Sequence, residues 1–395
     1  MRGIIALILM IQFHNFVFTQ PNASIPVVKK GHTGDPVLID VHTASKEKKT
    51  LGLSAIADDI EFIPLETAKD CLLDGTLINI VVTSSDIIVF DYQKGYRFNR
   101  SGKFLNSIGK KGQGPGEYVR PMRMEVDTIN RFIYFADDRK LLKYDYAGNY
   151  IETLSLNFGT KIILLAEPGY FAMDDKSYQF AKPNERFSLR FYDVKEKKVI
   201  SNFPCEHKEK VSGFIIADPV VYKFDNKVFV KDYWSDTIYV MRDYFRAEPY
   251  VVIDKGRFRN RSLPNTYYTT GKASSEERTV FEFTRIGESS RFILMLSNQG
   301  AVVYDKKEKK TIISDFIPEE RLCFVDDLYG GPGFVSHHFP DHLTGDKICT
   351  YGSSVKFTLD KNHLINDARY EKYKNMITGK DPEDNQIIMI INLKK

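Results

Sequence analysis

Three of the eight histidines lie close together beside an aspartate, in the stretch from Phe334 to His342. Imidazole and carboxylate side chains bind zinc and other divalent ions, so this cluster could form a metal site. Because side chains alternate across a strand, the neighbouring His337 and His338 would point to opposite faces of a sheet and could not easily bind one ion. We therefore predict no metal ion and no cofactor. His338, Asp341 and His342 remain the alternative metal ligands, and His337 is kept as a residue that contacts a ligand.

Pairs of neighbouring aspartates recur where runs of strand-forming residues end: Asp58-Asp59, Asp137-Asp138, Asp174-Asp175 and Asp326-Asp327. Two carboxylates across a cleft can hydrolyse a glycosidic bond, one of them acting as the acid and the other as the base. Aspartate is also a common turn residue, and its recurrence at similar repeat positions favours a role in turns. We predict that Asp137, Asp138 and Arg139 lie near the mouth of an axial channel and bind a polar ligand.

A second set of ligand candidates combines aromatic and charged side chains. The single tryptophan lies in the phrase WSDTIY, and an insertion from Lys255 to Arg278 is rich in Arg, Asn, Thr and Ser. Loops on a rigid scaffold are where binding residues collect, and tyrosine rings can stack on sugars. We predict that these residues line the rim of a ligand site: Trp234, Asp236, Arg257, Tyr267 and Tyr268.

A glycine-rich loop, Gly109 to Gly116, invites comparison with phosphate-binding loops. A P-loop needs lysine and then serine or threonine directly after its last glycine, whereas Glu117 and Tyr118 follow here. These glycines are expected to let the chain turn between two repeats. The chain also lacks GxSxG, HExxH and a Rossmann glycine pattern between a strand and a helix, so no catalytic residue is assigned.

Short strands must position all of these residues. The chain contains 28 Phe and 22 Tyr, and aromatic and β-branched residues favour strands. Near-continuous apolar runs such as Phe132–Phe135 and Phe292–Leu296 suit strands covered on both faces. Each run is followed by a polar turn, a second strand and a charged stretch such as Asp193–Lys198 or Asp305–Lys310, which we expect to be a solvated hairpin tip.

One aromatic residue precedes each predicted hairpin turn and marks a repeat of about 47 residues, typical of β-propeller blades: Phe98, Tyr144, Tyr192, Tyr239, Tyr304 and Phe357. We predict an all-β, six-bladed β-propeller over residues 51–395. A ring must be closed by pairing its ends, so Ile60–Leu65 and Ile387–Leu393 are predicted to share one blade. Residues at about 362–377 are predicted to form one helix outside the ring or across one end of it.

The N-terminus differs from the rest of the chain. Arg2 precedes an apolar run, Ile4 to Ile11, and a tolerable cleavage site lies just before Gln20, so residues 1–20 are predicted to be a signal peptide. A membrane span would need about 20 apolar residues, and no span is predicted for the mature chain. Residues 21–50 are predicted to be an extension with one short strand, Val37 to Val41. No lipobox cysteine follows the apolar run, and the mature protein is predicted to be exported, periplasmic or secreted and cell-surface associated.

The charge balance bears on which partners are expected, and the cysteine spacing bears on whether disulfides form. Lys and Arg number 56 and Asp and Glu 52, for a net charge of +4 with both signs interleaved, which argues against a nucleic-acid partner. Four cysteines show no CxxC spacing, so buried free thiols are favoured. Cys323 with Cys349 is the pair expected to form if any does, because both fall in one predicted repeat.

The run GKFLNSIGKKGQGPGEY, followed by Phe132 to Asp137 and Tyr144 to Gly148, resembles an NHL-type propeller repeat. More narrowly, the chain is similar to a bacterial family of exported six-bladed β-propellers of unknown function, from about Asp59 to the C-terminus. The phrases that carry this resemblance are IEFIPLET, WSDTIY, PYVVIDKG and DNQIIMIINL. The resemblance implies six blades and export, and it brings no agreed activity and no catalytic residues.

These observations predict an exported, non-enzymatic binding module that recognises a glycan, a peptide or a partner protein of the cell envelope through one face of the propeller. The alternative is a polysaccharide-acting hydrolase or lyase with carboxylates or histidines at the channel mouth. A structural subunit without a small ligand is a third possibility. An enzyme requires two titratable groups at catalytic separation, whereas a binding module needs only a shaped pocket.

Overall fold

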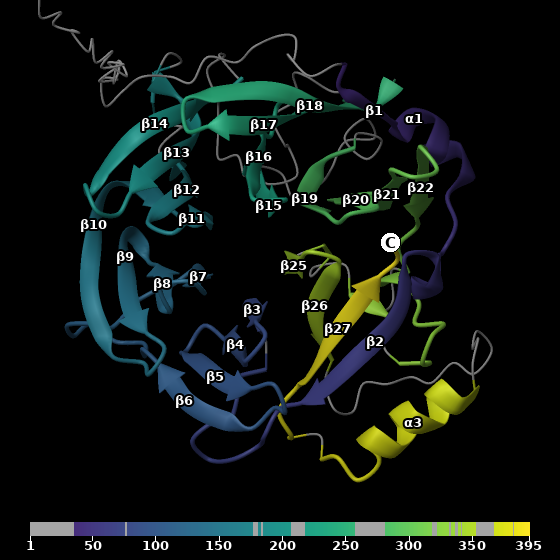
Figure 1. Cartoon of the computed structure of the whole chain (residues 1–395), viewed down its shortest axis with the longest axis horizontal. Coiled ribbons are helices and arrows are strands. Elements are labelled where there is room, and N and C mark those ends of the chain that lie inside the picture. Colours follow the sequence, from purple (N-terminus) through teal and green to yellow (C-terminus); the bar gives the residue numbers. More distant parts are fainter. Residues whose placement is uncertain are drawn as a thin grey trace, which may run out of the picture.

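A computed structural model describes residues 35–75, 77–176, 181–182, 185–206, 218–256, 281–317, 322–331, 333–335, 339–340, 342–352, 367–381 and 383–395. Six antiparallel sheets stand around one axis as the blades of a propeller (Figure 1). The predicted all-β, six-bladed fold is therefore confirmed. The predicted signal peptide, residues 1–20, lies outside the described residues. Within the described ranges no helix is long and apolar enough to cross a membrane.

In the first five blades, four consecutive strands run from the axis outward. Blade 1 contains β3 (Asn79–Val82), β4 (Asp86–Phe90), β5 (Gly95–Asn99) and β6 (Phe104–Ile108). Blade 2 contains β7 (Arg123–Asp127), β8 (Phe132–Ala136), β9 (Asp138–Asp145) and β10 (Tyr150–Thr160). Blade 3 contains β11 (Ile163–Glu167), β12 (Tyr170–Asp174), β13 (Phe187–Asp193) and β14 (Lys198–Pro204).

Blade 4 contains β15 (Val220–Phe224), β16 (Lys227–Lys231), β17 (Thr237–Asp243) and β18 (Arg246–Asp254). Blade 5 contains β19 (Phe283–Glu288), β20 (Phe292–Ser297), β21 (Gly300–Asp305) and β22 (Lys310–Ser314). Five of the predicted repeat markers, from Phe98 to Tyr304, lie on the third strand of these blades, so the repeat reflects one recurring supersecondary unit. The sixth marker, Phe357, lies outside the described residues.

The sixth blade joins the two halves of the chain. Its strands, from the axis outward, are β25 (Leu343–Thr344), β26 (Lys347–Gly352), β27 (Ile387–Leu393) and β2 (Ala57–Pro64). β2 and β27 are antiparallel, with Ile60 opposite Ile391 and Phe62 opposite Met389. The predicted closure is confirmed, and it removes the open strand edges that a ring of sheets would otherwise expose.

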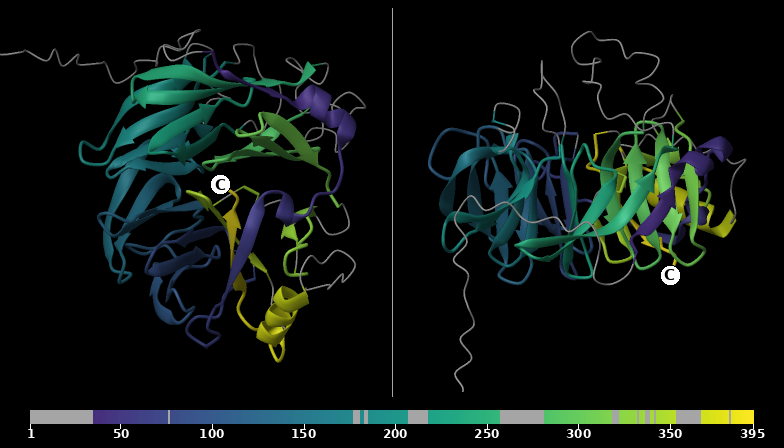
Figure 2. Two further views of the ribbon diagram at one scale, coloured as in Figure 1. Left: turned by 45° about the vertical axis from the view of Figure 1, so that its right-hand side comes forward. Right: turned by 90° about the horizontal axis from the view of Figure 1, so that it is seen from above.

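Residues 37–56 form a strap outside blades 4 and 5 (Figures 1 and 2). β1 (Val37–Asp40) pairs in parallel with β18, as the fifth strand of blade 4. The strap continues through α1 (Val41–Ala44), η1 (Ser45–Glu47) and η2 (Leu53–Ala55). Backbone bonds then tie it to the segment after blade 5, from Leu53 N to Val325 O at 2.8 Å and from Val325 N to Leu51 O at 3.0 Å.

The hydrophobic core lies mainly between neighbouring blades. Between blades 1 and 2, the ring of Phe135 packs 5.1 Å from that of Phe90 and 4.9 Å from that of Tyr118. The next residue back along the strand, Tyr134, points to the other face of the sheet and packs 4.9 Å from Phe171 of blade 3. Strands such as β8 are apolar on both faces because each face meets a different blade.

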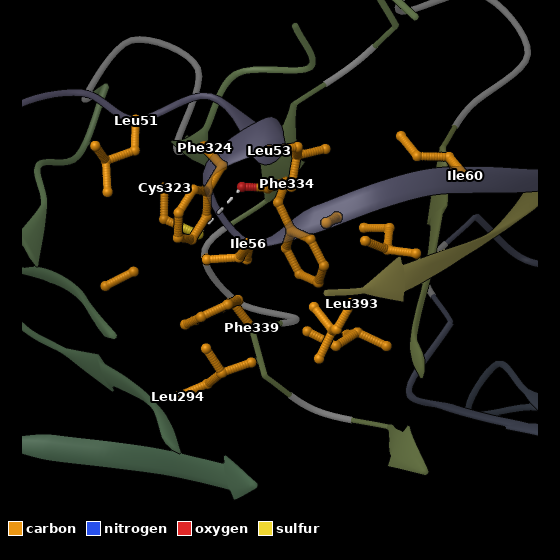
Figure 3. Packing of buried hydrophobic residues seen from close by; sticks show 14 of the residues in the cluster. Leu51, Leu53, Ile56, Ile60, Leu294, Cys323, Phe324, Phe334, Phe339 and Leu393 are labelled. Carbon is orange, nitrogen blue, oxygen red and sulfur yellow. Dashed lines mark hydrogen bonds between the residues drawn. The ribbon is translucent and has the colours of Figure 1, made fainter. Parts of the chain in front are cut away.

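The core beside the closing blade gathers residues from four parts of the chain, one of which is blade 5 with Leu294 (Figure 3). The strap contributes Leu51, Leu53 and Ile56, and the C-terminus contributes Leu393. The two-stranded sheet of β23 (Leu322–Phe324) and β24 (Phe334–Val335) contributes Phe324 and Phe334, with Phe339 against them. The thiol of Cys323 donates to the Phe334 carbonyl at 3.3 Å in the same cluster. This core holds the ring together where the chain ends meet.

The helix α3 (Asp367–Ile377) lies outside the ring, next to the closing blade (Figure 1). The predicted helix began at about residue 362, and residues 362–366 lie outside the described part of the chain. Tyr373 is only 1% exposed and packs 4.7 Å from Phe62 of β2. All four cysteines are buried and free, as favoured, and Cys323 and Cys349 are not paired.

Candidate functional site

One end of the ring carries the segments that cross from the outer strand of one blade to the inner strand of the next. We call it the crossover face. Inner strands start there, and the antiparallel second strands end there, as the pairing of Arg123 with Ala136 shows in blade 2. The junctions between second and third strands therefore lie on the crossover face too. The predicted ligand residues Asp137, Trp234 and Asp236 lie in these junctions, and Asp138 and Arg139 begin β9 there. The geometry brings these two sets of candidates to the same end of the molecule.

A buried aspartate at the end of the second strand recurs in blades 1 to 4. Each accepts backbone amide hydrogens from the segment that enters its own blade: Asp91 from Asp74 at 2.9 Å, Asp137 from Val119 and Arg120 at 2.9 and 2.8 Å, Asp174 from Lys161 and Ile162 at 2.8 and 2.7 Å, and Asp232 from Glu206 at 3.1 Å. A buried carboxylate needs hydrogen-bond donors, and these amides supply them, so the carboxylates fix the crossover segments to their blades. Of the predicted aspartate pairs, Asp137 and Asp174 have this structural role.

The two aspartates of the pair Asp137-Asp138 have opposite environments. Asp137 is 3% exposed, and besides its two amide donors it pairs with Lys140 at 3.2 Å. The Asp138 side chain is 67% exposed, its φ is +54°, and its nearest cation, Lys176, is 3.9 Å away. Arg139 is exposed beside it. Of the three residues of this predicted site, Asp138 and Arg139 are exposed to solvent and Asp137 is buried.

Trp234 and Asp236 lie in the turn between β16 and β17, where they form what we call the blade-4 platform with Tyr233 and Lys255. The rings of Tyr233 and Trp234 meet edge to face at 5.0 Å, and both are partly exposed. The Tyr233 hydroxyl donates to Glu282 at 3.0 Å. Asp236 and Lys255 form an ion pair at 2.7 Å. The Tyr233–Glu282 bond therefore holds the aromatic pair, and the ion pair ties its turn to the residue after β18.

Lys231 lies beneath the platform and is 2% exposed. Its ammonium group donates to the carbonyls of Asp232 and Tyr233 at 3.1 and 3.4 Å. Burial, followed by repulsion from Lys255, lowers the pKa of Lys231 to about 8. Burial also raises the pKa of Asp232, whose carboxylate accepts the Ser188 hydroxyl. Lys231 fixes the turn that carries the aromatic pair. Its burial was not predicted, because a lysine after an apolar strand is ordinarily a surface residue.

The inner strands carry a third set of charged residues that the sequence reasoning missed. Arg123 and Glu125 lie on β7 of blade 2, and Lys223 lies on β15 of blade 4. A carboxylate oxygen of Glu125 accepts the amide hydrogen of Leu165 on β11 of blade 3, at 3.4 Å. We call Arg123, Glu125 and Lys223 the axial cluster. The available signal was the presence of charged residues inside strands that are otherwise apolar, in the phrases RMEVD and VVYKF.

Glu125 is enclosed by protein on most sides, although solvent reaches part of it. Burial raises the pKa of Glu125 to about 7, against the opposing effects of Arg123, the Leu165 amide and Lys223. The carboxyl group therefore changes its charge close to neutral pH. A group that titrates in this range beside two cations is a candidate functional group.

Replacing Glu125 by glutamine should stabilise the protein at alkaline pH. The folded-state pKa of about 7 lies above the ordinary value of 4.5, so the folded wild type binds the proton more tightly than the unfolded chain and loses stability as pH rises from about 4.5 to 7. Glu125→Gln avoids this loss, which amounts to at most about 3 kcal/mol above pH 8. Urea unfolding at pH 5 and pH 8 measures the effect, and a variant advantage that is the same at both pH values would contradict it.

Several predicted residues cannot be placed. Arg257, Tyr267, Tyr268, His337, His338 and Asp341 lie outside the described residues. His342 is described, with a φ of +59° just before β25. Among the residues that the structure describes, no group of three or more His, Cys, Asp or Glu side chains is arranged to hold a metal ion.

The glycine-rich loop between β6 and β7 is packed against tyrosines. A Cβ at Gly109, where φ is +63°, would lie 2.7 Å from the Tyr118 ring, and one at Gly116, where φ is +71°, would lie 2.6 Å from the Tyr150 ring. The Tyr144 hydroxyl donates to the Gly116 carbonyl at 2.7 Å. Glycine is needed here for its positive φ and for the close approach of the rings, which agrees with a turn between two blades.

Comparison with known proteins finds a matching family and solved structures with a similar fold. The family model described as "Domain of unknown function (DUF4934)" matches residues 36–392. A crystal structure of a Bacteroides fragilis protein described as exported is 20% identical, covers 91% of this chain and 99% of its own, and superposes with a TM-score of 0.66. A DUF4221 family member from Bacteroides vulgatus is 10% identical over 86% of this chain and 97% of its own, with a TM-score of 0.50. At these identities the structures show a shared fold. No functionally curated protein matches the chain.

Proposed function

The chain belongs to the DUF4934 family, whose function is unknown, and we propose that it is an exported, non-enzymatic recognition module that binds its ligand on the crossover face. The proposed ligand is a glycan, a peptide or a partner protein of the cell envelope. The blade-4 platform is the proposed contact, with Asp138 and Arg139 at a second point on the same face. Export rests on the signal-like residues 1–20, and N-terminal sequencing of the mature protein tests it, because an intact Met1 would contradict cleavage.

The observation that carries this proposal is the aromatic pair of Tyr233 and Trp234. Both rings are partly exposed, yet the Tyr233 hydroxyl is bonded to Glu282, and the buried Lys231 holds the backbone of their turn. Rigid aromatic side chains lose little conformational entropy on binding, and they are the usual anchors of recognition sites. The Asp236–Lys255 ion pair lies beside them, with side chains that are 15% and 9% exposed, and it ties the turn to the residue after β18. This combination suits a sugar ring or a peptide side chain.

The alternative, a polysaccharide hydrolase or lyase, draws support from one observation. Lys231 has a lowered pKa near Asp232 and Asp236, as a catalytic base often has. However, Lys231 is 2% exposed and both of its hydrogen bonds go to backbone carbonyls, so a substrate would have to displace the turn to reach it. Recognition without catalysis therefore fits the geometry better.

Trp234→Ala should weaken binding to any ligand found on glycan and peptide arrays by at least about tenfold, because an aromatic anchor contributes about 2 kcal/mol or more. Phe245→Ala is the matched control, since Phe245 is 41% exposed on the hairpin at the opposite end of the same blade. Equal binding by wild type and Trp234→Ala would show that the blade-4 platform does not contact the ligand. A turnover assay on each hit separates recognition from catalysis, and hydrolysis or elimination of the ligand would favour the enzyme.

A further inference from the structure

We propose that the axis of the propeller holds a binding site for an oxyanion, a carboxylate or a sulfate group, between Arg123 of blade 2 and Lys223 of blade 4. While it is ionised, Glu125 repels an anion from this site, and it stops doing so when it takes up a proton. The site is separate from the blade-4 platform and does not rest on the function proposed for that platform.

The fold places the three residues on strands that surround the axis. β7, β11 and β15 are the innermost strands of blades 2, 3 and 4 (Figure 1). The bond from the Leu165 amide to Glu125 places that carboxyl group against β11, and Lys223 lies on β15 of the next blade. Arg123 and Glu125 are two residues apart on one strand, so their side chains leave the same face of β7. All three are partly exposed, and the open side of these strands is the axis.

The two cations are not used by the fold. Neither Arg123 nor Lys223 forms an ion pair or a side-chain hydrogen bond with the part of the chain that the structure describes. The Nε–H of Arg123 is buried and has no acceptor among those residues. An unsatisfied buried donor is costly, and a fork of guanidinium hydrogens matches the two oxygens of a carboxylate or sulfate. A bound oxyanion would supply the missing acceptor.

The ionisation of Glu125 sets the pH range in which the site can bind an oxyanion. The charged groups that face it are Arg123 on its own strand and Lys223 from β15, and its neighbour from β11 is the uncharged Leu165 amide. Above its pKa of about 7 the carboxylate partly neutralises the two cations and repels an incoming anion. Below that pH the group is neutral, and the positive charge of Arg123 and Lys223 is available. Oxyanion affinity should therefore rise as pH falls through neutrality.

Calorimetric titration of the mature protein with sodium sulfate and with sodium glucuronate, at pH 6 and pH 8 and constant ionic strength, tests the site. Neither probe titrates in this range, and glucose serves as the uncharged control. We expect at least tenfold tighter binding at pH 6 than at pH 8 for the probe that fits, and no binding of glucose. Binding of both probes assigns the site to oxyanions in general, of glucuronate alone to acidic sugars, and of sulfate alone to small inorganic anions.

Variants separate this site from a general charge effect. Arg123→Gln should abolish binding and Lys223→Gln should weaken it, whereas Glu125→Gln should bind at pH 8 as tightly as at pH 6. Lys103→Gln, which removes an exposed cation from the β5–β6 hairpin, should change nothing. Thermal unfolding confirms that each variant is folded, and Arg123→Lys, which keeps the charge but not the fork, replaces Arg123→Gln if that variant fails to fold.

Three results would overturn the inference: no binding of either probe to folded wild type at pH 6, full binding by Arg123→Gln, or an unchanged pH dependence in Glu125→Gln. Failure of the platform can be told apart from failure of the axial site. Trp234→Ala should bind these probes as the wild type does, because Trp234 lies in the turn between β16 and β17 and not on an inner strand.

Discussion

Deleting residues 387–395 should abolish folding of the whole propeller. This deletion removes β27, the strand that pairs with both β26 and β2. Its buried apolar side chains are Ile387, Ile388, Met389, Ile390, Ile391 and Leu393. At about 2 kcal/mol each they contribute on the order of 10 kcal/mol, which is comparable to the entire stability of a typical domain, about 5 to 15 kcal/mol. The loss also exposes the edges of β2 and β26, and we expect insoluble or aggregated protein.

The matched control removes only Lys395, which lies beyond the strand and should leave the unfolding temperature within a few degrees of wild type. Soluble yield, size-exclusion profile and thermal unfolding measure both variants. A soluble, cooperatively unfolding protein without β27 would show that the blades are stable without closure. That result would also remove the physical basis for placing both candidate sites on one rigid ring.

Asp137→Ala should lower the free energy of unfolding by about 2 to 4 kcal/mol. The substitution removes a buried carboxylate that accepts the amide hydrogens of Val119 and Arg120, and it removes the partner of Lys140. The segment that enters blade 2 would then be released from the end of β8. Urea denaturation of wild type and variant measures the loss.

Asp138→Asn is the neighbouring control, expected to change stability by less than about 0.5 kcal/mol. Its side chain is 67% exposed, and asparagine tolerates the φ of +54° that alanine would not. If the crossover face binds its ligand near this turn, Asp138→Asn should weaken binding without loss of stability. Equal destabilisation by both substitutions would contradict the assignment of Asp137 to the fold and Asp138 to the surface.

The sequence alone was sufficient for the architecture, because that architecture is repetitive and local. Each blade is built from four short strands that lie close together in the chain, so apolar runs, turn residues and the repeat length were visible without any long-range information. The closure between Ile60–Leu65 and Ile387–Leu393 was predicted because both strands lacked a partner, and unpaired edges are unfavourable. The sixth repeat marker, Phe357, lies outside the described residues. The third strand of the sixth blade is β27, which comes from the C-terminus.

The tertiary structure decided which polar residues serve the fold and which remain available to a ligand. Asp137 and Asp138 are identical neighbours in the sequence, yet one is buried against two amides and the other is exposed. Arg123 and Glu125 of blade 2 and Lys223 of blade 4 are far apart in the sequence, yet all three lie on inner strands that surround one axis. The physical reason is the same in both cases. Burial, hydrogen-bond partners and pKa depend on contacts between residues far apart in the chain, and a repeat pattern carries no record of those contacts.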